Sequence, residues 1–320
     1  MLRWRSAALK NTSKNAGAFS DCEGDGILNK PLLPLNDPEG DKLPESLPPV
    51  IDAHVHLFPD RLFGSIWQWF EQFGWPIRYQ LKAPQVIDFL LSRGINHIVG
   101  LHYAHKPGAA VKLNDHMAHL CGLYPQVTGM ATVFPGEENA RGVLEEAFNL
   151  GLKGVKLHSH VQCFDMASKG MSEIYEVCQE NNRPLVMHVG REPKSPAYDC
   201  DPYLLCRADK LEHVLKDHPR LRVCVPHLGA DEFEAYQRMI DQYDNLWLDT
   251  TMMFADYLPC SSPPPLDQMR ADRIMYGTDF PHIPYAWDRE LKRLHELGLS
   301  KKRLALILGE NAVEFFSISD

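Results

Sequence analysis

The sequence has no long hydrophobic run and little cysteine. No stretch of about 18 consecutive apolar residues occurs in its 320 residues, which excludes a membrane-spanning helix and predicts a soluble protein. None of its eight cysteines forms a C-x-x-C pair, so we expect reduced thiols and a cytoplasmic protein rather than a disulfide framework. It also lacks a glycine-rich phosphate-binding loop and a G-x-S-x-G motif, which disfavours nucleotide-binding folds and serine hydrolase chemistry.

Acidic residues outnumber basic ones outside the first twenty residues. The formal net charge is −9, and residues 1–20 contain four basic residues and no acid, so the rest of the chain is more acidic still. Phosphate binding needs clustered lysine and arginine. We therefore expect a small-molecule substrate, with neither nucleic acid nor a membrane as a partner.

Residues 1–48 differ from the remainder and predict an N-terminal extension that is irregular or partly disordered. They show no helical or strand periodicity, and prolines punctuate them toward their end. Residues 1–20 weakly resemble an organelle transit segment, although a surface-wrapping arm is the favoured interpretation. Residues 21–26 imitate the start of an EF-hand loop, but Leu32 stands where that loop needs a glutamate, so we reject calcium binding.

From residue 49 to 320, short β-rich runs alternate with amphipathic helical patterns. Eight such runs in about 270 residues predict an α/β fold, a single (β/α)₈ TIM-type barrel, with an open doubly wound sheet as the alternative. The predicted strands are residues 50–57, 97–102, 127–134, 154–158, 185–190, 222–228, 246–251 and 274–280. Helical patterns include residues 83–93, 138–150, 172–181, 211–217 and 232–243, and a helical tail covers 286–316.

Histidine is abundant, with fifteen residues, and its placement points to metal chemistry. The first predicted strand ends in D-A-H-V-H, so His54 and His56 share one face and can bind one metal ion. A second H-x-H pair, His158 and His160, shows that such a pair alone is weak evidence.

Four further predicted strands end in groups suited to metal binding or proton transfer. These are G-V-K-L-H at 154–158, V-M-H-V-G at 186–190, V-P-H-L-G at 225–229 and Y-G-T-D-F at 276–280. In a (β/α)₈ barrel the C-terminal ends of the strands meet at one mouth, so these residues become neighbours there.

This ordered set of motifs resembles the amidohydrolase superfamily, and more narrowly the amidohydrolase-related (amidohydrolase 2) group that contains aminocarboxymuconate-semialdehyde decarboxylase. The resemblance implies one divalent metal ion, usually Zn²⁺, with His54, His56, His188 and Asp279 as ligands. It also implies that His227 is the catalytic acid or base beside the metal. Barrels of this group often dimerise, so we expect a homodimer.

The leading expectation is a metal-dependent hydrolase. Zinc can lower the pKa of a bound water to about 7, so that hydroxide attacks an amide, lactone or ester carbonyl while Asp279 accepts the proton and His227 protonates the leaving group. The alternative is a non-oxidative decarboxylase of a small carboxylated substrate, such as an aromatic one. A third hypothesis is an inactive barrel that acts as a binding protein.

Lys156 leaves the metal count open. A carboxylated Lys156 bridging two metals is the less favoured alternative to a single ion. Alternation along a strand would place Lys156, His158 and His160 on one face. We then expect Lys156 to be an interior charge near the ligands and His158 to line the substrate pocket.

Several loops are candidates for substrate contact. Arg191, three residues beyond His188, could bind a substrate carboxylate or form a structural ion pair instead. The aromatic residues between positions 58 and 79 could form a lid, although a helix that packs its rings on the barrel is favoured. His102 and His282 also fall at strand ends and are expected to be bystanders.

Overall fold

A computed structural model describes residues 37–191, 195–257 and 265–318, which contain eight parallel strands. They are β1 (Ile51–His56), β2 (His97–Leu101), β3 (Val127–Gly129), β4 (Val155–His158), β5 (Leu185–His188), β6 (Val223–Val225), β7 (Leu246–Asp249) and β8 (Ile274–Met275). Each lies within a segment predicted as a strand. The predicted N-terminal extension lies mostly outside the described residues, as do the EF-hand-like segment and the basic residues 1–20.

The strands close into a barrel. Hydrogen bonding joins them in the orders β1-β2-β3 and β4-β5-β6-β7-β8, always in parallel. Two single bridges complete the circle, Ala131 with Val155 between β3 and β4, and Val55 with Phe280 between the chain after β8 and β1. The predicted (β/α)₈ barrel is therefore confirmed, and the doubly wound alternative is wrong.

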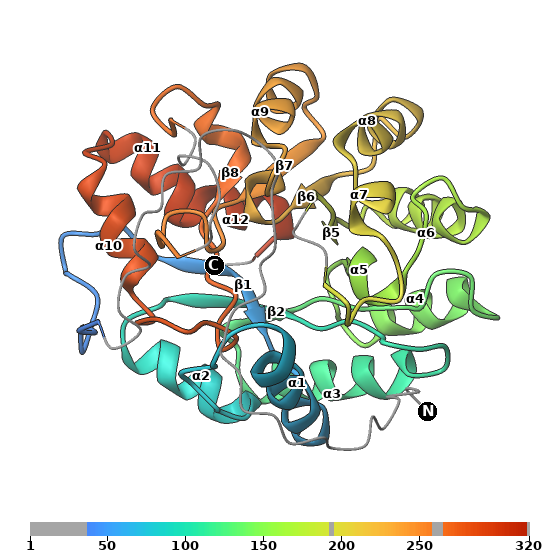
Figure 1. Ribbon diagram of the computed structural model, residues 1–320, viewed down its shortest axis with the longest axis horizontal. Coiled ribbons are helices and arrows are strands. Elements are labelled where there is room, and N and C mark those ends of the chain that lie inside the picture. The colour runs from blue at the N-terminus through green and yellow to red at the C-terminus, as the bar shows by residue number, and fades with distance from the viewer. Residues whose placement is uncertain (1–36, 192–194, 258–264, 319–320) are drawn as a thin grey trace.

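Helices alternate with the strands along the chain, and most of them surround the barrel (Figure 1). They are α1 (Asp60–Phe73), α2 (Ala83–Ser92), α3 (Ala110–Leu123), α4 (Ala140–Asn149), α5 (Ser159–Gln162), α6 (Lys169–Glu180), α7 (Pro202–Leu205), α8 (Ala208–Asp217), α9 (Phe233–Gln242), α10 (Arg289–Glu296), α11 (Lys301–Ala305) and α12 (Asn311–Phe316). Short turns of 3₁₀ type, η1 (His227–Gly229) and η2 (Ala271–Arg273), and a π-turn, η3 (Leu306–Glu310), connect some of them.

Capping residues explain where the predicted boundaries were wrong. Helix α6 begins at Lys169, earlier than predicted, because the Ser168 side chain accepts a hydrogen bond from the Met171 amide at 3.4 Å. The predicted continuous tail is divided because Gly298, with φ of +65°, follows α10 and Ser300 caps α11.

Two large groups of buried side chains form most of the core. One fills the space between the strands and the surrounding helices. The other fills the barrel interior, where residues such as Val99, Val186 and Met275 meet Phe315 and Phe316 of α12. Helix α12 thus closes the end of the barrel opposite the C-terminal ends of the strands, which leaves those C-terminal ends to form a site.

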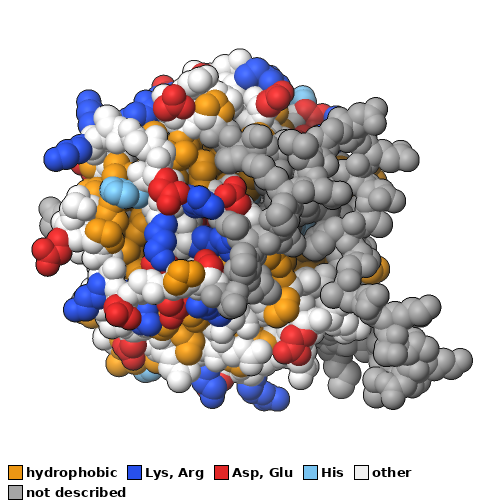
Figure 2. Space-filling model, turned by 60° about the vertical axis from the view of Figure 1, so that its left-hand side comes forward, with side chains coloured by type: hydrophobic (Ala, Val, Ile, Leu, Met, Phe, Trp, Pro, Cys, Tyr) orange, Lys and Arg blue, Asp and Glu red, His pale blue; other side chains and the backbone are white. Residues whose placement is uncertain are grey.

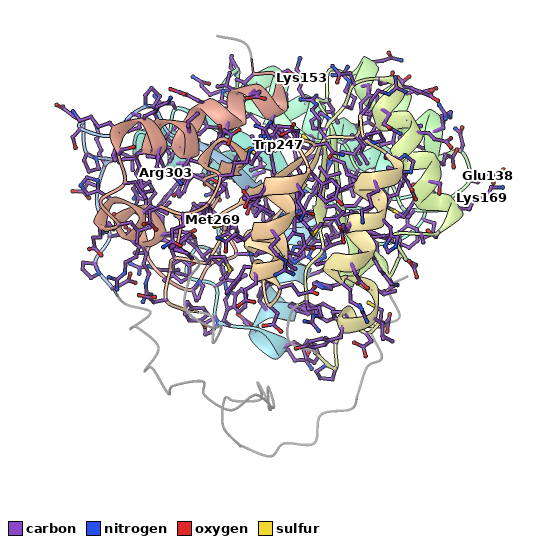
Figure 3. The ribbon with its side chains drawn as sticks, turned by 90° about the horizontal axis from the view of Figure 1, so that it is seen from above. Glu138, Lys153, Lys169, Trp247, Met269 and Arg303 are labelled. Atoms are coloured by element: carbon purple, nitrogen blue, oxygen red, sulfur yellow. The ribbon has the colours of Figure 1, made fainter. Side chains whose placement is uncertain are left out.

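Outlying segments are tied down by polar contacts. Asp37 accepts hydrogen bonds from Arg78 and from the Ala286 amide, at 3.2 and 3.1 Å. Arg303 of α11 donates to the carbonyls of Leu266 and Met269 in the chain after β7 (Figure 3).

The surface carries both signs of charge. On the face in Figure 2, lysine and arginine side chains alternate with aspartate and glutamate. Among the described residues no helix is long and apolar enough to cross a membrane.

Candidate active site

The C-terminal ends of the strands carry nearly all the predicted site residues. His54 and His56 lie on β1, Lys156 and His158 on β4, and His188 at the end of β5. His227 begins η1 directly after β6, and Asp279 lies in the segment that follows β8.

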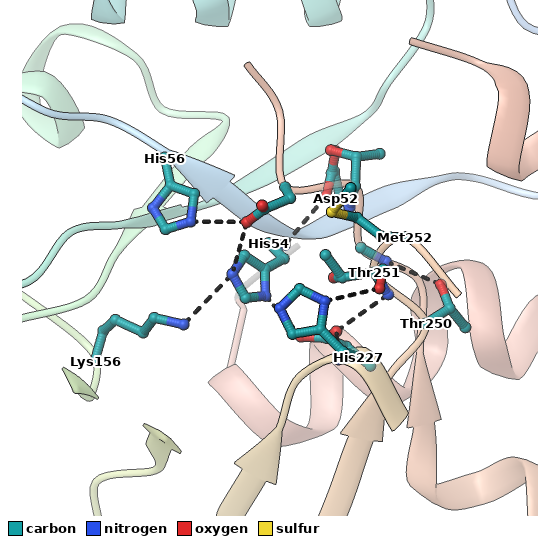
Figure 4. Close-up of polar contacts among 12 residues, drawn as sticks. Asp52, His54, His56, Lys156, His227, Thr250, Thr251 and Met252 are labelled. Carbon is teal, nitrogen blue, oxygen red and sulfur yellow. Dashed lines mark hydrogen bonds and ion pairs between the residues drawn. The ribbon is translucent and has the colours of Figure 1, made fainter. Parts of the chain in front are cut away.

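Asp279 brings the two histidines of β1 together (Figure 4). Its Oδ1 atom lies 2.9 Å from Nε2 of His56 and 3.4 Å from Nε2 of His54. The donor atoms of the three side chains all lie within 4.8 Å of one another, and the side chains are largely buried. Two imidazoles and a carboxylate in this arrangement suit a borderline divalent cation.

The tautomer of His54 is set by Asp249, at the end of β7. His54 Nδ1 donates to Asp249 Oδ2 at 2.8 Å, because a carboxylate only accepts. The lone pair of His54 therefore lies on Nε2, the atom that faces Asp279. A carboxylate behind a ligating histidine is the usual way that metal sites orient the ring. Asp249 was missed from the sequence, although its place at a strand end was a signal.

Asp249 and Thr251, at the end of β7 and just after it, also orient His227. Its Nδ1 atom donates to the Thr251 carbonyl at 3.0 Å, and its amide donates to Asp249 Oδ1 at 3.1 Å. Its φ of +56° is an uncommon conformation for a side-chain-bearing residue, which these contacts hold in place. The His227 ring lies 5.8 Å from that of His54 and 4.7 Å from that of His188.

A second group of imidazoles lies on β4 and β5. His158, His160 and His188 have donor atoms within 4.8 Å of one another. His188, predicted as the fourth ligand beside His54, His56 and Asp279, thus groups with other histidines here. The predicted single strand face through His160 is wrong, because β4 ends at His158 and His160 lies in α5.

Lys156 lies inside the barrel beside the group formed by His54, His56 and Asp279. The lysine is fully buried, and its Nζ atom lies 3.4 Å from His54 Nε2. This position agrees with the expected interior charge near the ligands.

Arg191 makes an ion pair with Glu232, the residue directly before α9. Its Nε lies 3.3 Å from Glu232 Oε1, its guanidinium lies over the ring of Tyr203, and its side chain is 38% exposed. The sequence left two alternatives open for Arg191, and this contact is the structural ion pair. A role for Arg191 in binding substrate stays a prediction.

Asp52 and Gly277 allow the chain after β8 to pack closely against β1. Asp52 accepts hydrogen bonds from the Thr278 hydroxyl at 2.6 Å and from the His54 amide at 3.1 Å. A Cβ at Gly277 would lie 2.5 Å from Thr251 Oγ1 and 2.7 Å from His54 Cβ, so only glycine permits this close packing.

Aromatic side chains of α1 pack beside the site. The segment predicted as a lid or a packing helix is a helix, and Phe63 is buried in it. Phe63 and Phe70 contact the ring of His282, which stacks on His56 with centroids 4.9 Å apart. His282, expected to be a bystander, therefore forms part of the wall behind a predicted ligand.

His54 and Asp279 have the protonation states that metal ligands require. Burial lowers the pKa of His54 to about 4, aided by the charge of Lys156. Burial acts to raise the pKa of Asp279, but the interaction with His56, which includes a hydrogen bond, outweighs burial and holds that pKa well below its usual value. A neutral imidazole beside an ionised carboxylate is the form that binds a cation.

The metal-free protein is expected to lose stability as the pH falls below about 6.5. Burial lowers the pKa of His102 and of His282 to about 3, as it lowers that of His54 to about 4. Unfolding restores a pKa near 6.5, so the unfolded chain binds more protons in this range. The free energy of unfolding should fall by about 1.4 kcal/mol per pH unit for each net proton. Asp52, whose pKa burial raises to about 7, opposes this trend in part.

Melting temperatures measured from pH 7.5 to 5 on metal-free protein test this expectation. His102→Asn should reduce the slope by about one proton, because it removes one of the titrating groups. A stability independent of pH over this range would contradict it.

Comparison with known proteins places these features in context. A family model described as amidohydrolase, Amidohydro_2, matches residues 51–318. No curated protein matches the chain. An uncharacterised TIM-barrel protein from Bordetella bronchiseptica is 18% identical, with a TM-score of 0.64 over 84% of this chain and 98% of that one.

Two further structures with known ligands are similar in fold. The 5-carboxyvanillate decarboxylase from Novosphingobium aromaticivorans, complexed with manganese and 4-hydroxy-3-methoxy-5-nitrobenzoic acid, is 18% identical, with a TM-score of 0.61 over 87% of this chain and 99% of that one. The probable 2-pyrone-4,6-dicarboxylic acid hydrolase from Acinetobacter baumannii, with citric acid bound, is 18% identical, with a TM-score of 0.57 over 84% of this chain and 99% of that one. At such identities the likeness establishes the fold alone.

Proposed function

Because the chain belongs to the amidohydrolase family of metal-dependent enzymes, we propose that it hydrolyses an amide, lactone or ester bond of a small molecule. The observation that carries the proposal is the convergence of Asp279 Oδ1 on the Nε2 atoms of His54 and His56. These three residues would hold the cation, and the part of His188 as a fourth ligand stays a prediction.

The bound cation would supply a Lewis acid that polarises a carbonyl oxygen or acidifies water. Zinc is the ion we propose, because two imidazoles and a carboxylate suit it. The manganese in the similar decarboxylase makes manganese the first alternative to test.

Asp279 would accept a proton from the attacking water. Its carboxylate is ionised, because its pKa lies well below the usual value, and one of its oxygens points between the two histidines of β1. A carboxylate in this position can take the proton and return it to the leaving group in a later step.

His227 exchanges protons through Nε2. Its Nδ1 atom holds a proton shared with the Thr251 carbonyl, so the neutral ring presents a lone pair at Nε2. Because Nδ1 is engaged in this way, Nε2 is the atom of His227 that would accept a proton or donate one to the leaving group.

A non-oxidative decarboxylase is the second candidate. It is favoured by the aromatic wall beside His56, where Phe58, Tyr103 and His282 all contact its ring. Such a wall suits a flat aromatic carboxylate, and the similar decarboxylase binds a substituted benzoic acid. In this reaction His227 or Asp279 would deliver a proton to the carbon that loses CO₂.

Product analysis in ¹⁸O-labelled water separates the two reactions. Purified protein loaded with zinc, and separately with manganese, is incubated with panels of lactones, esters, amides and carboxylated phenols. Hydrolysis predicts one labelled oxygen in the product and no CO₂. Release of CO₂ without ¹⁸O uptake would contradict the hydrolase proposal and support the second candidate.

A further inference from the structure

We propose that Tyr103 is a further catalytic residue, whose hydroxyl donates a hydrogen bond to the substrate oxygen that becomes negatively charged during hydrolysis. This role rests on the proposed function, because it names a group of the chain that would stabilise the charge formed in that reaction. Tyr103 lies two residues beyond the end of β2, outside the motifs at the strand ends and outside both clusters of metal-binding side chains.

Tyr103 belongs to a closed circuit of ring contacts at the mouth of the barrel. Six rings contact one another in turn, with neighbouring centroids 4.0 to 5.9 Å apart. In order they are His54, His56, Tyr103, His158, His188 and His227. Asp279 contacts the two histidines of β1 in this circuit. The phenol ring therefore stands beside the group that would hold the cation.

The backbone places this ring on the inner side of the barrel. Leu101 ends β2, and its side chain lies in the barrel interior. Alternation along an extended chain puts Tyr103 on the same side, one layer nearer the mouth. The next residue is held by two side chains, because the Ala104 amide donates to Thr132 Oγ1 at 3.1 Å and its carbonyl accepts from Gln162 Nε2 at 3.0 Å. The chain position of Tyr103 is thus fixed by the fold.

Three neighbouring rings fix the orientation of the phenol. Its centroid lies 4.7 Å from that of His158, 5.0 Å from that of Phe58 and 5.9 Å from that of His56. All three contacts are edge-on, with interplanar angles of 66°, 80° and 84°. A ring packed on three sides has little freedom to turn. A donor held in place in this way needs no reorganisation when charge develops, which is what makes it effective in a transition state.

The hydroxyl of Tyr103 is available to a ligand. No residue within 37–191, 195–257 or 265–318 forms a hydrogen bond with it, and the side chain is only half-buried. Burial and the charge of Asp279 raise the pKa of Tyr103 above its usual value, so the hydroxyl keeps its proton at neutral pH. His227 presents a lone pair at Nε2, whereas a phenol presents an O–H donor. Tyr103 therefore offers what that imidazole does not.

The hydrogen bond acts on the oxygen of the carbonyl under attack. When water adds to the carbonyl carbon and Asp279 takes its proton, the carbon–oxygen double bond becomes a single bond and negative charge gathers on that oxygen. Tyr103 donates to this oxygen without losing its own proton. The double bond forms again when the leaving group departs with the proton that Asp279 held. Because the oxygen carries most charge midway, the bond from Tyr103 strengthens in the transition state.

Tyr103→Phe tests the role, since phenylalanine keeps the ring contacts and removes only the hydroxyl. On the substrate found in labelled water, kcat should fall by about 10²- to 10³-fold with little change in KM. Zinc-loaded protein should also bind phenylphosphonate, a tetrahedral anion, about 10- to 100-fold more weakly in a calorimetric titration. Tyr243→Phe is the matched control, because the Tyr243 hydroxyl donates to Glu212 on the outside of the barrel and should affect neither measurement.

The outcomes separate this role from the proposed function. Wild-type kcat and phosphonate affinity in Tyr103→Phe would overturn the role of Tyr103 and leave the hydrolase standing. A fall in zinc content or melting temperature in Tyr103→Phe would assign the hydroxyl to structure and would overturn it too. Absence of phosphonate binding by zinc-loaded wild type would also count against it. Weaker phosphonate binding in Tyr103→Phe, in a protein that turns over no ester, lactone or amide, would support the role of Tyr103 as an anion donor and contradict the proposed function.

Discussion

Asp279→Asn is expected to keep the fold and to lower kcat by about 10²- to 10⁴-fold, the usual contribution of a positioned proton acceptor. Asparagine has nearly the same shape, and it tolerates the φ of +69° that position 279 requires. The amide, however, cannot accept a proton at neutral pH and is a weaker ligand than a carboxylate. The loss should therefore appear in turnover and not in the melting temperature of the metal-free protein.

The measurement is kcat and circular dichroism on variant and wild type at equal metal content. Asp272→Asn is the matched control, because Asp272 lies just before β8, at the opposite end from Asp279, and pairs with Arg270 and Arg273. Wild-type turnover in Asp279→Asn would remove this residue from its assigned role.

A graded loss of zinc affinity is the second large expected effect. His54→Ala should lose the zinc ion outright, because it removes a ligand. Asp249→Asn should bind that ion about 10- to 100-fold more weakly, since it disturbs only the support of the ring. The single Asn oxygen can accept from His54 Nδ1 or from the amides of His227 and Thr251, whereas Asp249 serves all three.

Competition with a chromophoric zinc chelator measures both affinities. His97→Ala is the control, because His97 begins β2 at the opposite end of the barrel and pairs with Thr128. Zinc should also raise the melting temperature of wild type and do so less in His54→Ala, since a bound ligand stabilises the folded state. Equal affinity in wild type and His54→Ala would contradict the assignment of His54 as a zinc ligand.

Much of the fold could be predicted from the sequence because its signals are local. Alternating β-rich and amphipathic segments define the repeating unit, and the number and length of the units favour a closed barrel. Family membership could likewise be inferred from the motifs at strand ends, and the match over residues 51–318 confirms it. The helix boundaries predicted wrongly were those set by a single capping residue, such as Ser168 before α6.

The parts of the site that the sequence did not predict arise from contacts between distant segments. Asp249 reaches His54 across 195 positions, and no local pattern marks that pairing. The grouping of His188 with His158 depends on the register of β4 against β5, and the place of His160 depends on where β4 ends. The N-terminal extension, the homodimer and the cytoplasmic location stay predictions.

The sequence alone therefore determined which elements form and which of their ends carry imidazoles and carboxylates, because helix, strand and turn preferences act between neighbouring residues. Only the tertiary structure decided how those groups divide, with His54, His56 and Asp279 in one cluster and His158, His160 and His188 in a second. It also assigned the proton of His54 to Nδ1, through Asp249. Barrel closure and strand register set these distances, and both are properties of the whole chain.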